Sequence, residues 1–366
     1  MDKSNILIVT RDYPPGRGGQ GVYASRIHKR FLDKGLNSHV LTSRIEEKIH
    51  SATYQNVHDV KAKMGRASFV PRACIYFFRK LRKYKWDIIH GNGIDHVFLL
   101  LFKRKDVKYV TTIQNSYPQR LETKRGNIPF EILYRCIFIP IEKFVLKRSD
   151  EIIAVSNRTY SYVSSMTKNK HIHLIGNGVD SEKFIPVEKD TDVFRFIFIG
   201  RFEERKRPLF TVKMFEEVQK RYKGEKKLEL YMLSDGSMFE TVRKYVEDNR
   251  LGSVHFTGFV PDPNEYIKLC HCIVLFSHGE GLPLVIVESV AAGLAAVATV
   301  DATGGSDVVK NGVNGYVVSD DIDEEEIIAG MLHTIGTFNQ FSAESKKIGR
   351  TYDWDAVADD IIRVYE

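Results

Sequence analysis

The chain has 366 residues, a formal net charge of +7 and a hydrophobic content of 43%. This length predicts two domains, each large enough for its own core, and the composition fits a globular protein. The most apolar stretch, 128–146, is interrupted by charged residues and Pro140, which argues against a membrane span.

The charge is unevenly placed along the chain. Residues 1–190 carry 34 Lys and Arg against 18 Asp and Glu, a balance of +16, whereas the remainder carries 20 against 29, a balance of −9. This asymmetry indicates an anionic partner for the N-terminal half.

The four cysteines, Cys74, Cys136, Cys270 and Cys272, show no metal-binding or disulfide framework. Cys270-His271-Cys272 could be a fragment of a metal site, but it lies at the start of an apolar strand without a second ligand pair nearby, so we expect buried thiols there. The N-terminus leads directly into a strand, without a signal peptide. We therefore expect a cytoplasmic protein.

Apolar strands alternate with amphipathic helices through the first half of the chain. The expected strands are 5–10, 39–42, 86–90, 109–113 and 151–155, with helices from about 22 to 35, at 94–102 and at 140–148. Such alternation is typical of a doubly wound parallel sheet.

The same pattern restarts after a polar linker at 182–192. The expected strands are 194–199, 228–233, 254–256, 272–276 and 295–299, and the expected helices are 209–220, 239–249, 264–269 and 284–292. We therefore predict an α/β protein with two Rossmann-like domains, whose parallel sheets face a ligand-binding cleft between the domains.

The segment Ser277–Glu288 carries two acids, Glu280 and Glu288. An apolar strand enters a Gly-rich loop that ends at Pro283, a residue suited to the start of a helix, and Gly293 supplies a left-handed helix end. Amides at a helix start bind phosphate and carboxylates accept hydrogen bonds from hydroxyls, so the segment predicts a nucleotide-sugar site. Two carboxylates also suit a glycosidase, and two acids alone would more often be a helix-end charge and a surface acid.

Cations follow the first strand of the second half. Arg201 stands at the carboxyl end of that strand and Lys206 near the next helix, positions that suit binding of a diphosphate. The alternative is a solvated basic loop, because Arg205 and Arg207 adjoin.

A glycine loop, Gly16–Gly21, matches the G-x-G-x-x-G pattern of dinucleotide-binding proteins. Five residues separate it from the first strand, and Arg44 stands where an acid would hold a ribose, so a dehydrogenase is only a minor alternative. We expect Gly18 and Gly19 to let the backbone approach a diphosphate or sugar, although an ordinary surface loop would have the same composition.

The stretch Phe69–Trp86 mixes aromatic and basic residues at helical spacing. Ile75, Phe78 and Leu81 share one face, whereas Arg79, Arg82 and Lys83 lie largely off it. The stretch predicts either a helix with its apolar face in the core or a segment that docks on an anionic membrane. No recognised nucleic-acid motif accompanies it, so we expect no nucleic-acid partner.

Taken together, these residues resemble a GT-B glycosyltransferase of family 4, a retaining group. The resemblance covers most of the chain and rests on the order and spacing of several motifs: Gly18-Gly19-Gln20-Gly21, Ser149-Asp-Glu-Ile-Ile-Ala-Val-Ser156, Asn177-Gly-Val-Asp180 with Phe184-Ile-Pro186, Gly200-Arg201…Lys206, Glu280…Glu288, Gly304-Gly305 and Asn311-Gly-Val-Asn-Gly315. It implies an acceptor-binding domain at 1–180, joined by a terminal helix at 352–366, and a nucleotide-sugar domain at 181–351.

The resemblance also implies roles for individual residues. Arg201 and Lys206 would bind the donor diphosphate, Glu280 the sugar or its phosphate, and Glu288 the ribose. Other donor contacts would come from the backbone of Gly281, Leu282, Pro283 and Leu284 and from the turn at Val260. The implied reaction transfers a hexose or N-acetylhexosamine from a nucleotide sugar, with UDP the commonest choice, to a glycan or lipid-linked glycan.

The chain departs from the family pattern after the strand 109–113, where Gln114 and Asn115 replace a frequent His. His90 and His96 are further candidates at the cleft, although a structural role suits them as well, and Ser234 replaces a frequent Gly. No strand ends in Asp-x-Asp, so we expect no metal and no cofactor. The alternatives are a nucleotide-sugar epimerase and a non-catalytic membrane- or polyanion-binding protein.

Overall fold

The computed structural model describes residues 4–14, 19–43, 55–62, 65–115, 131–132, 134–183, 189–305, 308–321 and 323–366. These residues form two compact units. Unit 1 comprises Met1–Asn177 and Trp354–Glu366, and unit 2 comprises Gly178–Asp353. The chain thus leaves unit 1 near the expected boundary at 180 and returns to it for its last helix.

Unit 1 contains a seven-stranded parallel sheet in the order β3-β2-β1-β4-β5-β6-β7. Its strands are β1 Asn5–Val9, β2 Asn37–Thr42, β3 Val57–Asp59, β4 Ile88–Asn92, β5 Lys108–Ile113, β6 Glu151–Ala154 and β7 Ile172–Leu174. The sequence analysis missed the short edge strands β3 and β7, because three residues are too few for a clear apolar pattern. The order of the strands reverses between β1 and β4.

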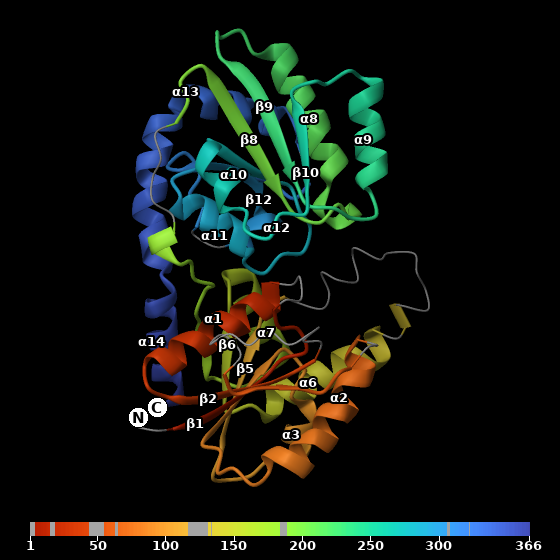
Figure 1. Ribbon diagram of the computed structural model, residues 1–366, viewed down its shortest axis with the longest axis vertical. Helices are drawn as coiled ribbons and strands as arrows, with labels where there is room; N and C mark the ends of the chain where they lie inside the picture. The colour runs from red at the N-terminus through yellow and green to blue at the C-terminus, as the bar shows by residue number, and fades with distance from the viewer. Residues whose placement is uncertain are drawn as a thin grey trace. The chain divides into compact units, whose positions relative to one another are not determined.

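Helices cover both faces of this sheet (Figure 1). They are α1 Gly19–Asp33, α2 Gly65–Tyr76, α3 Val97–Leu101, α6 Ile139–Arg148, α7 Asn157–Met166 and α14 Trp354–Tyr365, with π-helical turns η2 Phe77–Leu81 and η3 Tyr134–Phe138. Helix α14 packs on α1: Trp354 meets Tyr23, Tyr365 meets Phe31, and Lys34 pairs with Asp359 at 2.7 Å. The last helix of the chain is therefore part of unit 1.

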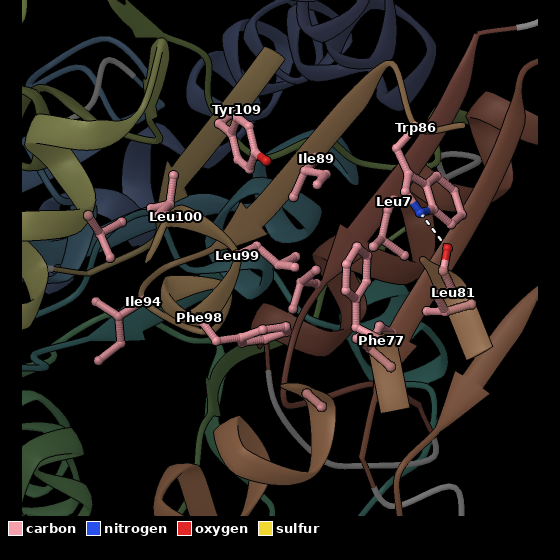
Figure 2. Close-up of a cluster of buried hydrophobic side chains, with 14 of the residues drawn as sticks. Leu7, Phe77, Leu81, Trp86, Ile89, Ile94, Phe98, Leu99, Leu100 and Tyr109 are labelled. Carbon is pink, nitrogen blue, oxygen red and sulfur yellow. Dashed lines mark hydrogen bonds between the residues drawn. The ribbon is translucent and has the colours of Figure 1, made fainter. Parts of the chain in front are cut away.

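An apolar cluster of unit 1 lies beneath α2, η2 and α3 (Figure 2). Phe77 and Leu81 point into it beside Leu7 and Ile89, and the indole Nε1 of Trp86 donates to the carbonyl of Leu81 at 3.0 Å. Phe69 and Ala73 continue the same face at steps of four residues.

The buried face of α2 and η2 differs from the one that we predicted. We grouped Ile75 and Phe78 with Leu81 on the core face, but Ile75 is 54% exposed and Phe78 38%. Residues four positions apart, from Phe69 to Leu81, form one row of side chains that packs on the sheet. Ile75 and Phe78 lie outside this row.

Unit 2 contains a six-stranded parallel sheet in the order β10-β9-β8-β11-β12-β13. Its strands are β8 Val193–Ile199, β9 Lys227–Leu233, β10 Val254–Gly258, β11 Cys272–Leu275, β12 Ala295–Thr299 and β13 Gly315–Val318. Only the edge strand β13 was absent from the sequence analysis. The predicted class, two α/β units with parallel sheets, is confirmed.

Four helices of unit 2 follow the predicted pattern, whereas the long helix α13 (Glu324–Gly349) and the short helix α12 (Val300–Thr303) were not predicted. The four are α8 Pro208–Arg221, α9 Phe239–Asp248, α10 Asn264–Leu269 and α11 Leu284–Ala291, and the unit also contains the 3-10 turns η4 Ser181–Lys183, η5 Glu204–Lys206 and η6 Arg350–Tyr352. Within the polar linker expected at 182–192, residues 184–188 lie outside the described residues. Among the helices that the structure describes, none is long and apolar enough to cross a membrane.

The buried thiols predicted at Cys270 and Cys272 are confirmed. Cys270 and Cys272, which flank and begin β11, are fully buried, whereas Cys74 is half-buried and Cys136 is exposed. Cys136 lies on η3, between the exposed residues Arg135 and Ile137, so this turn presents it to solvent.

Candidate functional site

The carboxyl edge of the unit 2 sheet brings together the loops that follow β8 and β11. The order of the strands reverses between these two neighbours, so their loops lead to opposite faces of the sheet and leave a crevice between them. Arg201–Lys206 follows β8, and Ser277–Pro283 follows β11. Ligands of open parallel sheets bind at such reversals.

Glu280 lies at this point between two cations. Its Oε1 lies 2.7 Å from the Nζ of Lys206 and also accepts a hydrogen bond from the guanidinium of Arg205. The side chains of Glu280 and Lys206 are only 9% and 11% exposed. The sequence analysis named Lys206 and Glu280 separately, and the structure brings them into direct contact.

Burial and charge act in opposite directions on this cluster. Burial alone would raise the pKa of Glu280, but the positive charges of Lys206 and Arg205 outweigh it and hold that pKa below its ordinary value. Burial lowers the pKa of Lys206, and Glu280 opposes this effect. The result is a preformed site in which a carboxylate balances two cations.

A second set of contacts holds the loop that carries Glu280. The carboxylate of Asp301, at the start of α12, accepts from the amide of Gly279 at 3.3 Å and lies 3.5 Å from the Nδ1 of His278. The amide of His278 donates to the carbonyl of Arg205 at 2.9 Å, and its ring contacts Arg207. Three neighbouring strands, β8, β11 and β12, thus contribute to one network.

The sequence analysis missed Arg205, His278 and Asp301 as members of the site. Arg205 was considered only as part of a solvated basic loop, and His278 was given no role although it lies in the predicted nucleotide-sugar segment. Asp301 lies two residues after the predicted strand 295–299. This position was the available signal, because the carboxyl ends of parallel strands share one edge.

Arg201 occupies a different environment from Lys206. Its side chain is 59% exposed and pairs with Glu203 at 2.8 Å, so it does not join the Glu280 cluster. The two predicted phosphate-binding cations therefore differ: one is buried and paired, and the other is open to solvent.

Helix α11 begins as predicted. Pro283 is its N-cap, Leu284 its first residue, and Glu288 lies in its second turn, half-buried. Gly281 and Leu282 are buried directly before it. Beyond the other end of the helix Gly293 has a φ of +82°, where the predicted left-handed conformation is confirmed.

The turns after β9 and β10 complete this edge. Ser234 has a φ of +116°, a conformation that favours glycine, and its amide donates to the carbonyl of Gly258 at 2.8 Å. Gly236 packs so tightly that an added Cβ would lie 2.7 Å from the backbone of Phe202. Val260 is half-buried in the turn that follows Gly258.

In unit 1 the corresponding reversal lies between β1 and β4. The amide of Arg11 donates to Asp95 at 2.8 Å, and the side chain of Asn92 donates to the carbonyl of Gln20 at 3.1 Å. Gly19 is the exposed first residue of α1, and Gly18 lies outside the described residues.

The remaining candidates of unit 1 line the strands β4 and β5. His90 is buried, with its Nδ1 2.5 Å from the hydroxyl of Tyr365 and its Nε2 2.6 Å from that of Thr112, and burial lowers its pKa to about 3. Both ring nitrogens are thus engaged within unit 1, as a structural role requires. Gln114 is buried and Asn115 half-buried at the carboxyl end of β5.

Arg79, Arg82 and Lys83 are exposed on η2 and the turn that follows it. Within the described ranges, no three His, Cys, Asp or Glu side chains gather as a metal site would require. The absence of a metal stays a prediction.

Two Rossmann-like units of this topology are the architecture of GT-B glycosyltransferases, and comparison with known proteins agrees. The chain matches the family models "Glycosyltransferase Family 4" over residues 17–183 and "Glycosyl transferases group 1" over residues 193–336. It belongs to this family of glycosyltransferases, as predicted, and it is a transferase.

Several curated relatives align over most of the chain. It is 26% identical to the UDP-Gal:alpha-D-GlcNAc-diphosphoundecaprenol alpha-1,3-galactosyltransferase of Escherichia coli, over 70% of this chain and 72% of that protein. It is 23% identical to the N-acetyl-alpha-D-glucosaminyl L-malate synthase of Bacillus anthracis, over 83% and 81%. A match to an uncharacterized glycosyltransferase of Methanocaldococcus jannaschii, 28% identical, covers 53% of this chain and 49% of that protein.

Solved structures support the fold. The sucrose-phosphate synthase of Thermosynechococcus elongatus aligns with a TM-score of 0.82 at 17% identity, over 99% of this chain and 98% of that one. HepE of Anabaena, solved in complex with UDP, aligns with a TM-score of 0.73 at 16% identity, over 98% of both chains. The GT-B fold is therefore confirmed.

Proposed function

We propose that this glycosyltransferase moves a hexose or N-acetylhexosamine from a UDP-sugar to a glycan or lipid-linked glycan of a bacterial surface polysaccharide, with retention of the anomeric configuration. The observation that carries the proposal is the paired cluster of Lys206, Arg205 and Glu280 at the strand-order reversal of unit 2. A buried carboxylate that balances two cations beside a helix start offers both charge for a diphosphate and an acceptor for sugar hydroxyls.

In this proposal the residues of unit 2 position the donor. Lys206 and the exposed Arg201 bind the diphosphate and stabilise the negative charge that grows on it as the glycosidic bond breaks. Glu280 orients the transferred sugar or its phosphate, and Glu288 accepts hydrogen bonds from the ribose. Backbone groups from Gly281 to Leu284 contact the phosphate and the sugar, and the turn at Val260 approaches the base.

The choice of UDP and of the acceptor draws support from similar proteins. The structure of HepE contains UDP, and the name of the E. coli relative specifies UDP-galactose and a diphosphoundecaprenol-linked acceptor. We assign the acceptor to unit 1, where Gln114 and Asn115 follow β5, and the donor to unit 2. We further propose a cytoplasmic protein that associates peripherally with the membrane.

The first test is binding of UDP, GDP and ADP to the intact protein by calorimetry. We expect UDP to bind most tightly, and Arg201→Ala to weaken that binding about tenfold to 100-fold, because a charge-assisted hydrogen bond contributes ~1.5–3 kcal/mol. Arg243→Ala is the matched control, since Arg243 is also exposed and pairs with a carboxylate, Glu240, on α9. Affinity within twofold of wild type for Arg201→Ala would remove Arg201 from the site.

The second test is the reaction itself. Wild-type protein with a labelled UDP-sugar and a lipid-linked acceptor should form a product whose anomeric configuration, read by NMR, matches that of the donor. Conversion of the donor to an epimer without acceptor would instead indicate an epimerase, and binding without turnover of any donor would indicate a non-catalytic protein.

A further inference from the structure

We propose that unit 1 carries a membrane-docking surface made by two elements, η2 and the end of α3, which inserts exposed apolar side chains into an anionic bilayer. The inference rests on the proposed function, in which the acceptor is lipid-linked. We name this surface the η2–α3 patch and define it by the apolar residues Ile75, Phe78, Leu101 and Phe102 and the basic residues Arg79, Lys80, Arg82, Lys83 and Lys105.

The apolar part of the patch is unusually open for large side chains. Leu101 is 61% exposed and Phe102 62%, directly at the end of α3, and Ile75 is 54% exposed on α2. Phe78 joins the two elements, because its ring meets that of Phe102 edge-on with a centroid distance of 5.4 Å. Contiguous exposed apolar side chains on a protein surface indicate an interaction site.

Packing beneath the patch holds these side chains outward. The ring of Phe78 also meets that of Phe77. Phe77 points into the core with Leu81 (Figure 2), so η2 is anchored there. Phe78 itself is 38% exposed. Helix α3 is anchored in the same way by Phe98 and Leu99. The elements that carry the patch are therefore anchored in the core of unit 1.

The charges along α2 and η2 are of one sign, whereas Lys105 is followed by Asp106, which pairs with Arg104. No Asp or Glu occurs between Asp59 and Asp87, whereas Arg79, Lys80, Arg82 and Lys83 are all exposed in that interval. The guanidinium of Arg82 lies 5.9 Å from the ring centre of Phe78, so charge and apolar surface are in contact. Among the described residues, no carboxylate forms an ion pair with these four or with Lys105.

This combination fits an anionic lipid surface better than a soluble polyanion. Basic side chains reach the headgroups, and the exposed aromatic and aliphatic side chains enter the acyl boundary, as in interfacial segments. A nucleic acid would use the charges but would leave Leu101 and Phe102 exposed. The apolar half of the patch is thus what selects a bilayer.

The test is sedimentation of the intact protein with vesicles of equal parts phosphatidylcholine and phosphatidylglycerol. We expect wild-type protein to bind and to be released by high salt, since screening shortens the reach of exposed charges. Arg79→Glu/Arg82→Glu/Lys83→Glu should lower partitioning by at least about 100-fold, given about fivefold per charge removed. Leu101→Ser and Phe102→Ser should each lower it about tenfold.

A matched control separates the patch from overall charge. Lys29→Glu/Lys168→Glu/Lys170→Glu changes the net charge by the same amount at exposed positions of unit 1 outside the patch. It should keep most of the binding. An equal loss in this control, or no binding by wild-type protein, would overturn the proposal.

Insertion is tested by Phe102→Trp. Its fluorescence should shift to the blue with anionic vesicles and be quenched by brominated acyl chains. Absence of quenching, or vesicle binding that Leu101→Ser and Phe102→Ser leave unchanged, would overturn the proposal in favour of a polyanion-binding surface. UDP binding and transfer to a soluble acceptor test the proposed function and do not involve the patch, so the two can fail separately.

Discussion

The pairing of Glu280 with two cations makes a strong prediction for Glu280→Gln. The carboxylate and the ammonium of Lys206 are both almost fully buried and 2.7 Å apart, and Arg205 shares the same oxygen. The amide of glutamine keeps an acceptor but removes the negative charge. Two neighbouring cations are then left in a poorly solvated place without compensation.

The magnitude follows from the burial of the pair. Breaking a buried ion pair by removing one partner costs ~3–5 kcal/mol, and we take about 3 kcal/mol here because glutamine still accepts a hydrogen bond. For a unit of this size the melting temperature falls by ~2–4 °C per kcal/mol, so we expect a decrease of about 6–12 °C. Saturating UDP should raise the melting temperature of the variant at least as much as that of wild type, because the diphosphate supplies the missing negative charge.

The assay is urea and thermal unfolding of Glu280→Gln, Lys206→Met and the double variant. The double variant should be clearly more stable than the sum of the single changes predicts, because it removes both charges. Glu203→Gln in the same loop is the control: its partner Arg201 is exposed, and a surface pair contributes ~0–1 kcal/mol. Additive changes, or a loss for Glu280→Gln no larger than for Glu203→Gln, would refute this account of the cluster.

Three further predictions concern single sites. Asp301→Asn should lower stability by ~1–3 kcal/mol and weaken UDP binding, because the carboxylate holds the loop of Glu280; unchanged urea midpoint and affinity would contradict this. Ser234→Gly should raise stability by ~1 kcal/mol in urea unfolding by relieving the φ of +116°, and a loss of stability would argue against strain there. Burial, followed by the charge of His39, lowers the pKa of His58 to about 4. As the pH falls from about 6.5 to about 4, the unfolded chain therefore takes up this proton before the folded chain does, and the free energy of unfolding should decrease. His58→Gln should reduce the dependence of the free energy of unfolding on pH by at most ~1 kcal/mol per pH unit, because solvent screens this half-buried side chain. Urea midpoints measured at several pH values test this.

Much of the fold could be predicted from the sequence, because its determinants are local. Buried parallel strands read as short apolar runs, and Pro283 and Gly293 mark the limits of a helix through their own backbone preferences. The family resemblance added the candidate motifs, since Lys206 and Glu280 each lie in a recognisable segment. The edge strands β3 and β7 escaped because three residues are too few for that apolar signal, and the edge strand β13 was missed although its residues are apolar.

The tertiary structure decided what depends on contacts between distant residues. Whether Lys206 meets Glu280, 74 positions later, depends on the adjacency of β8 and β11 in the sheet, which no local pattern encodes. The same holds for Phe78: helical spacing gives α2 and η2 several apolar faces, and packing on the sheet selects one of them. The sequence by itself therefore determined most of the elements and the family, and the tertiary structure determined which charges pair and which aromatic side chains remain at the surface.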